Sequence, residues 1–164
     1  MFINYEPDEA LDRLTRDAAI MFNVPIAMIN FVTPAHVTFK SCVGLEQGDH
    51  IERNGAFCSQ AVEQDSPLVI PDARNHEVFM TSPLVTGPLQ IRSYAGKSII
   101  TLDGLRVGTF CLLDTKLHNF TKNEIKLLSM FTASAEEHLQ SLLCTSRSSL
   151  SSLIADDVAS QASA

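Results

Sequence analysis

Two apolar, β-branched runs surround an Asp-Gly pair in the segment Ile91-Arg-Ser-Tyr-Ala-Gly-Lys-Ser-Ile-Ile-Thr-Leu-Asp-Gly-Leu-Arg-Val-Gly-Thr-Phe-Cys-Leu-Leu-Asp114. Asp103-Gly104 predicts a β-hairpin, because both residue types tolerate the positive φ angles of a type I′ turn. Neither run alternates cleanly between apolar and polar residues, a pattern that is typical of strands with both faces buried. We therefore expect a central hairpin with helices on one side and a second layer on the other.

A long helix is expected after the hairpin, because Thr121-Lys-Asn-Glu124 forms a capping box. Apolar residues then recur at near-heptad spacing, so part of the helix should pack on the sheet and part against a second copy of the chain. The sequence becomes serine-rich beyond Leu143. We therefore predict one domain over residues 1–143 and a helical extension or flexible tail over residues 144–164.

Upstream of the hairpin, Pro7 and the acidic residues around it are typical of the first turn of a helix. Apolar residues at helical spacing continue this helix to about Asn23. Two adjacent strands are expected next, over Ile26–Val32 and Val37–Val43, because both segments are rich in apolar and β-branched residues.

The segment 44–90 reads as a series of short elements. We expect an exposed loop from Gly44 to Arg53, a short helix over Ala56–Val62 and a strand over Leu68–Ile70. Asp72 is typical of the N-cap of a helical turn that runs to Phe79. Thr81 to Gln90 contains two prolines and a glycine, which favours a loop.

This order of elements predicts an α+β fold with one antiparallel sheet. The N- and C-terminal helices should pack together on one face of the sheet. The segment 44–90 should lie over the other face and enclose a pocket.

Four segments outside the hairpin, read together with it, resemble the GAF domain of bacterial signalling proteins. They are Phe39-Lys-Ser-Cys-Val-Gly-Leu45, Phe57-Cys58, Val69-Ile-Pro-Asp-Ala73 and Pro83-Leu-Val-Thr-Gly87. The resemblance extends from about Asp8 to about Leu142 and is carried by the order and spacing of the segments. Relatives in this subgroup precede histidine kinases and cyclic-dinucleotide enzymes and usually have an aromatic residue where this chain has Ser93.

Composition and charge narrow the range of partners. The chain has 164 residues, enough for one core, and a net charge of −7 without a basic stripe, so neither nucleic acid nor a membrane surface is an expected partner. No stretch approaches the ~20 apolar residues of a membrane helix, and the first residues lack the features of a signal peptide. We therefore expect a cytoplasmic protein.

The sequence lacks the usual groupings of catalytic and metal-binding residues. The histidines and the four cysteines are scattered, with no C-x-x-C pair, so no metal, cofactor or disulfide is expected, and we predict a protein that is not an enzyme. Cys58 is the most reactive candidate, because it begins a short helix. Free methionine-(R)-sulfoxide reductases resemble the chain at this cysteine, but they need an upstream resolving cysteine and tryptophans. Only Cys42 lies upstream, and there is no Trp.

Alternation along the first run of the hairpin places Arg92 and Tyr94 on the same side of a strand, opposite Ser93. If that side faces the cover, Arg92 could bind an anionic ligand; alternatively, it pairs with Asp72 or with a backbone carbonyl. Cys58 and Cys111 could equally be simple core residues. The residues that we expect to contact a ligand are Phe57, Cys58, Asp72, Phe79, Leu84, Arg92, Tyr94 and Cys111.

The resemblance implies a non-catalytic sensory domain that binds a small molecule and signals through its terminal helices as a homodimer. A histidine kinase or a diguanylate cyclase would be the effector. The Cys-His pair of bilin-binding relatives and the Asn-Lys-Phe-Asp-Glu signature of cyclic-nucleotide-binding relatives are absent, so the ligand stays unidentified. Two alternatives stay open, namely a reductase-like thiol enzyme and a purely structural dimerisation module.

Overall fold

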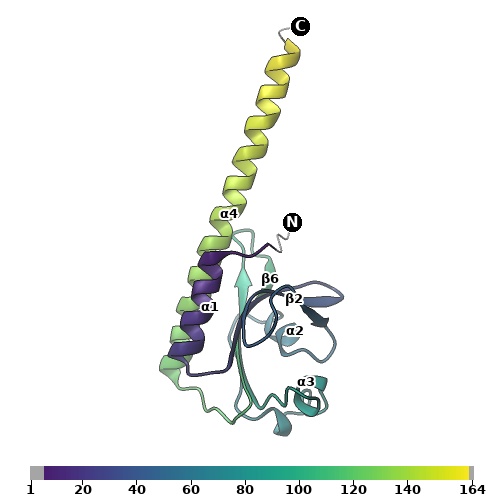
Figure 1. Cartoon of the computed structure of the whole chain (residues 1–164), viewed down its shortest axis with the longest axis vertical. Helices are drawn as coiled ribbons and strands as arrows, with labels where there is room; N and C mark the ends of the chain where they lie inside the picture. Colours follow the sequence, from purple (N-terminus) through teal and green to yellow (C-terminus); the bar gives the residue numbers. More distant parts are fainter. Residues whose placement is uncertain (1–5, 163–164) are drawn as a thin grey trace.

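The computed structural model describes residues 6–162 of the chain and the side chains of residues 6–145. The described residues form one six-stranded sheet with helices on both faces (Figure 1). The helices are α1 (Glu9–Met21), α2 (Phe57–Ala61), α3 (Pro83–Thr86) and α4 (Lys122–Ala162), with a 3-10 turn, η1, over Ala73–Asn75. The strands are β1 (Ile26–Val32), β2 (His36–Val43), β3 (His50–Glu52), β4 (Leu68–Ile70), β5 (Ser93–Ile100) and β6 (Arg106–Asp114).

The expected hairpin is the pair β5–β6, and it lies inside the sheet. The strand order is β3-β2-β1-β6-β5-β4, and every neighbouring pair is antiparallel. β6 is therefore bonded on both edges, to β1 and to β5. This arrangement confirms the α+β class and the single antiparallel sheet.

The turn of the hairpin differs from the type I′ geometry that the Asp-Gly pair predicts. Gly104 has a φ of 81°, but Asp103 is not among the residues with positive φ. The Gly104 N–H donates to the Thr101 carbonyl at 2.9 Å, and the Thr101 N–H donates to the Leu105 carbonyl at 2.9 Å. A longer loop of this kind needs the left-handed conformation only at the glycine, where no Cβ opposes it.

The terminal helices cover one face of the sheet. α1 packs against β1 and β2, α4 packs against β5 and β6, and the two helices contact each other (Figure 1). Leu11, Ile29, Phe110 and Leu128 belong to the core between helices and sheet. This confirms the expected helix layer.

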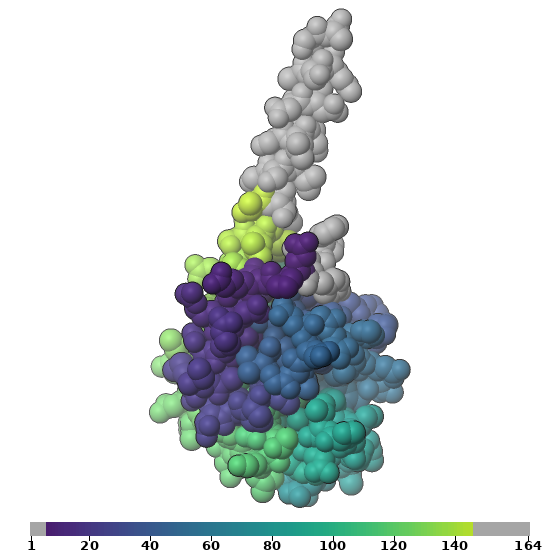
Figure 2. All heavy atoms as spheres, viewed as in Figure 1, coloured from purple at the N-terminus to yellow at the C-terminus, as the bar shows by residue number. Residues whose placement is uncertain are grey.

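Residues 44–90, which we call the cover segment, supply the two edge strands β3 and β4 and place α2, η1 and α3 on the opposite face. The space-filling view shows this segment in blue and teal, to the right of the purple N-terminal helix (Figure 2). Met28, Phe57, Tyr94 and Cys111 belong to the second core, between the cover segment and the sheet. Because both faces are buried, the strands carry apolar residues at successive positions, which explains why they do not alternate.

Several boundaries differ from the sequence-based expectation. The cover segment contains a short strand, β3, within the expected loop from Gly44 to Arg53, and a helical turn, α3, within the expected loop from Thr81 to Gln90. Asp72 caps only the 3-10 turn η1, so no helix continues to Phe79. Pairing with β2 explains β3, because strand propensity is decided largely by neighbouring strands.

The long C-terminal helix begins at the predicted capping box. The Thr121 N–H donates to Glu124 Oε2 at 2.7 Å, and the Glu124 N–H donates to Thr121 Oγ1 at 3.2 Å. The backbone of α4 continues as one helix to Ala162, through most of the residues expected as an extension or tail, whose side chains beyond residue 145 lie outside the description. Over residues 6–162, we find no helix with the length and apolar character that crossing a membrane requires.

Candidate functional site

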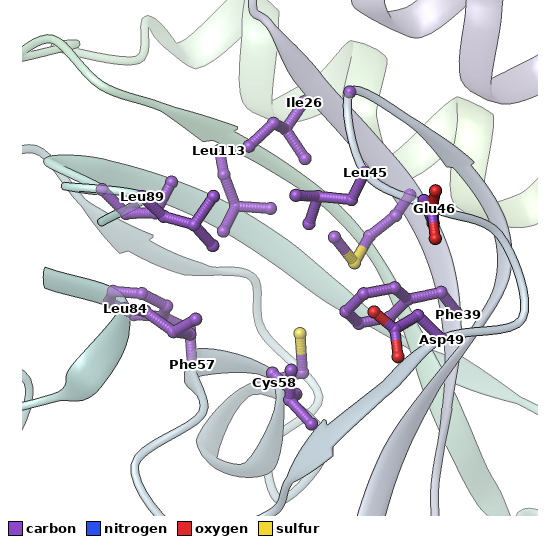
Figure 3. A pocket seen from close by; sticks show the side chains of 14 residues that line it. Ile26, Phe39, Leu45, Glu46, Asp49, Phe57, Cys58, Leu84, Leu89 and Leu113 are labelled. Carbon is purple, nitrogen blue, oxygen red and sulfur yellow. The ribbon is translucent and has the colours of Figure 1, made fainter. Parts of the chain in front are cut away.

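A cavity of about 420 Å³ lies between the sheet and the cover segment. Side chains from both layers converge on it (Figure 3). Its lining is mostly apolar, with two exposed carboxylates, those of Glu46 and Asp49. The lining residues are Ile26, Met28, Phe39, Gly44, Leu45, Glu46, Asp49, Ile51, Phe57, Cys58, Leu84, Leu89, Ile91 and Leu113.

The sheet supplies one wall of the cavity. Met28 of β1, Phe39 of β2 and Leu113 of β6 present their side chains to the side of the cover segment. Because side chains alternate along a strand, the adjacent residues Ile29 and Leu112 pack toward the terminal helices instead. The strands that form the wall therefore also touch the helix layer.

Two polar side chains hold the cover segment around the cavity. Ser82 Oγ donates to the Gly55 carbonyl at 2.6 Å and accepts from the Leu84 N–H at 3.3 Å, which caps α3. Arg92 Nη1 donates to the carbonyl oxygens of Val85 at 3.0 Å and Ile91 at 3.1 Å. Arg92 thus takes the backbone-carbonyl partner that we considered as an alternative, and it does not line the cavity.

The aromatic residues of the expected site form a cluster in which only one member reaches the cavity. Phe57 lines the cavity. Its ring lies on that of Tyr94, with centroids 5.0 Å apart and planes 15° apart, and its centroid is 4.5 Å from that of Phe79. Tyr94 and Phe79 are buried behind Phe57 and do not line the cavity.

Some of the remaining expected residues line the cavity, and others lie outside its lining. Leu84 and Cys58 line the cavity, whereas Cys111 lies buried behind Cys58. Asp72 is outside the lining and is the N-cap of η1, where its carboxylate accepts from the Arg74 N–H at 3.1 Å and from Arg74 Nε at 3.0 Å. These hydrogen bonds from Arg74 lower the pKa of the Asp72 carboxyl.

The thiols of Cys58 and Cys111 are close neighbours, with Sγ atoms 3.7 Å apart. The hydrogen bond with Cys111, aided by Tyr94 and Asn30, lowers the pKa of the Cys58 thiol to about 7, although burial acts to raise it. Burial raises the pKa of Cys111 well above its ordinary value, and the hydrogen bond with Cys58 acts in the same direction. Burial also raises the pKa of Cys42, to about 11. The thiolate is therefore more favoured at Cys58 than at Cys111 or Cys42.

Several lining residues were not among those expected from the sequence, including Met28, Leu45, Leu89 and Leu113. Period-two alternation could have identified Leu113, because it shares a strand face with Cys111. Leu45 and Leu89 come from irregular parts of the chain, where no periodicity indicates the direction of a side chain. Among the residues whose side chains are described, no group of three or more His, Cys, Asp and Glu could hold a metal ion.

The fold and the cavity define an α+β domain with a pocket between its sheet and its cover. The sequence of residues 6–139 matches the GAF domain family, and the chain belongs to this family.

One curated relative is a bacterial phosphodiesterase. The chain is 26% identical over 139 residues to a cyclic di-GMP phosphodiesterase of Pseudomonas aeruginosa. The match covers 84% of this chain but only 24% of that protein, so the chain spans about a quarter of its relative.

Solved structures share the fold at low sequence identity. A domain of a putative two-component sensor histidine kinase protein from Sinorhizobium meliloti matches with a TM-score of 0.64 and 14% identity, over 85% of this chain and 98% of that one. A free methionine-R-sulfoxide reductase from Neisseria meningitidis matches with a TM-score of 0.63 and 16% identity, over 77% and 74% of the two chains. The same fold therefore occurs both in a sensor protein and in an enzyme.

Proposed function

We propose that this chain is a non-catalytic sensory domain that binds a small molecule in the cavity between sheet and cover segment. The observation that carries the proposal is the cavity itself. Its volume of about 420 Å³ lies within the range of roughly 300–1,000 Å³ that is usual for small-molecule sites. A purely structural module would instead fill this space with its own side chains.

The lining favours an uncharged or cationic ligand with a large apolar part. Apolar side chains dominate the wall, and no Lys or Arg is present among its residues. Glu46 and Asp49 place negative charge at the cavity, which repels phosphate and carboxylate groups. This argues against an anionic ligand held by Arg92, whose guanidinium is engaged with backbone carbonyls.

The signal would pass through the central strands to the terminal helices. Met28 and Leu113 touch the cavity, and their neighbours Ile29 and Leu112 pack in the helix-facing core. A ligand shifts such an arrangement only to the extent that it binds one conformation better than the other. A small displacement of β1 and β6 would then change how α1 and α4 pack.

The output would lie in an effector such as a histidine kinase or a cyclic-dinucleotide enzyme, for example a diguanylate cyclase. The cyclic di-GMP phosphodiesterase relative and the sensor histidine kinase neighbour support this choice. Ile20 and Met21 of α1 and Met130 of α4 are exposed apolar residues, which supports a homodimer through the terminal helices. Residues 144–164 would then continue this helical contact beyond a domain formed by residues 1–143.

One observation favours a second function, that of a thiol enzyme related to the methionine sulfoxide reductases. The sulfur of Cys58 points into the cavity in Figure 3, and the pKa of its thiol is lowered to about 7. The thiol nearest to it is Cys111, not the upstream Cys42 that the reductase comparison suggested. Turnover of methionine sulfoxide that is lost in Cys58→Ser would favour the enzyme over the sensor.

Thermal melts against a panel of neutral, cationic and phosphate-bearing compounds test the sensory proposal. A compound present at about 100 times its dissociation constant stabilises the folded state by roughly 2.7 kcal/mol. We expect a neutral or cationic compound to give such a shift, and Leu84→Trp, which fills the cavity, to abolish it.

The matched control is Leu117→Trp, at a residue that is 58% exposed and outside the lining, and it should keep the full shift. A shift that persists in Leu84→Trp would place binding elsewhere. The absence of any shift over a broad panel would contradict the proposal.

A further inference from the structure

Two cysteines from different layers of the fold meet beside the cavity. Cys58 belongs to α2 in the cover segment, and Cys111 belongs to β6 at the centre of the sheet. Their sulfurs are 3.7 Å apart, although 53 positions separate them in the sequence. A disulfide requires about 2.05 Å between the sulfurs, so bond formation needs an approach of less than about 2 Å.

Polar groups surround this pair within an otherwise apolar core. Asn30 Nδ2 donates to Cys58 Sγ at 3.1 Å and to Cys111 Sγ at 3.6 Å, and the Tyr94 hydroxyl donates to Cys58 Sγ at 3.6 Å. The Thr109 hydroxyl donates to Asn30 Oδ1 at 3.1 Å, which turns the amide NH₂ group of Asn30 toward the sulfurs. Donors aimed at a sulfur stabilise its thiolate, the form that reacts.

The two sulfurs differ in how accessible they are from the cavity. Cys58 lines the cavity, and Figure 3 shows its sulfur pointing inward. Cys111 has no exposed surface and is not among the lining residues. A small molecule that enters the cavity therefore meets Cys58 first, and Cys111 can react only with Cys58.

We propose that Cys58 and Cys111 are a redox-active dithiol, which a small hydroperoxide entering the cavity converts to a disulfide. The Cys58 thiolate attacks one peroxide oxygen, so that an S–O bond forms, the O–O bond breaks and the other oxygen leaves as an alcohol or water after taking up a proton. Cys111 then loses its proton and attacks Cys58 Sγ. An S–S bond forms, and the S–O bond breaks to release water. Two thiols are thus oxidised, and one hydroperoxide is reduced.

The disulfide would have a structural consequence. It would link α2 of the cover segment to β6, a central strand that is bonded on both edges. The cavity wall at Cys58 would then be fixed to the sheet. The dithiol proposal does not depend on which ligand the sensory domain binds. The redox proposal and the sensory proposal can therefore fail independently.

Peptide mapping after treatment of the reduced full chain with hydrogen peroxide tests this assignment. We expect a cross-linked Cys58–Cys111 peptide with the loss of two hydrogens, in wild type and equally in the matched control Cys42→Ser/Cys144→Ser. At about pH 7, Cys58 should react at least roughly tenfold faster than Cys42, because the thiolate is the nucleophile. Tyr94→Phe, which removes one donor, should slow the reaction.

The variant Cys111→Ser separates the two steps. It should accumulate a sulfenic acid on Cys58 that dimedone traps, and it should form no cross-link. Circular dichroism of each reduced variant checks that it folds. The wild-type peptide map tests for the Cys58–Cys111 link without any variant. The assignment is overturned if wild type forms no Cys58–Cys111 link, or if Cys58 passes to sulfinic acid while Cys111 stays reduced.

Discussion

The hydrogen atom that serves as the side chain of Gly108 allows β6 to lie against β1. A Cβ at this position would lie 1.8 Å from the Asn30 carbonyl oxygen, far inside any allowed contact. Gly108 pairs with Phe31 of β1 and with Ile99 of β5, so neither neighbouring strand can move away freely. The backbone atom that requires a glycine at this position is visible only in the structure.

We expect Gly108→Ala to lower the free energy of unfolding by about 2 kcal/mol or more, because the new methyl group overpacks two central strands. Gly104→Ala, in the turn of the same hairpin, meets no atom within 4 Å and should cost only about 1 kcal/mol for its left-handed backbone. Urea denaturation measures both. Equal effects would mean that β1 and β6 are less closely packed than described.

At the level of the elements, Asp8 joins the two terminal helices. Its carboxylate caps α1 by accepting from the Leu11 N–H at 3.0 Å, and His138 Nε2 of α4 lies 2.8 Å from Asp8 Oδ2. The sequence predicted the helix and placed Pro7 in its first turn. The structure begins α1 at Glu9 because Asp8, not Pro7, provides the local capping contact.

This contact makes the helix pair sensitive to acid. Burial acts to raise the pKa of Asp8, but the hydrogen bonds from His138 and Leu11 lower it overall, below its ordinary 3.8. A lowered native pKa stabilises the fold above the unfolded value, and that stability is lost as the pH falls below about 4. Asp8→Asn keeps a good cap without this titration.

We therefore expect wild type to be more stable than Asp8→Asn at about pH 7, and the difference to shrink as the pH falls through about 4. Thermal melts across this range measure the difference, and the other carboxylates act equally in both proteins. A difference that stays constant or grows toward low pH would show that the His138 contact does not favour the ionised carboxylate.

At the scale of the whole molecule, the sequence predicted segments with a regular pattern of residues better than irregular segments. The hairpin, the first two strands, β4 and the capping box of α4 follow local rules, and the order of elements was enough to predict two layers on one sheet. The cavity depends on how the cover segment folds back. Phe57 reaches the cavity while Tyr94 lies beneath its ring because of a contact between segments distant in sequence. Arg92 turns to the Val85 carbonyl in a nearby irregular part of the chain, where no periodicity indicates its direction.

The central claim is that occupation of the cavity changes the terminal helices. Methionine methyl groups report on the cavity and on the terminal helices in one spectrum. Met28 lines the cavity, while Met21 and Met130 are exposed on α1 and α4. The measurement is a methyl NMR titration with the most stabilising compound from the thermal screen. We expect the Met28 signal to shift and the signals of Met21 and Met130 to follow with the same saturation. Shifts at Met21 and Met130 without one at Met28, or a shift at Met28 alone, would contradict the account.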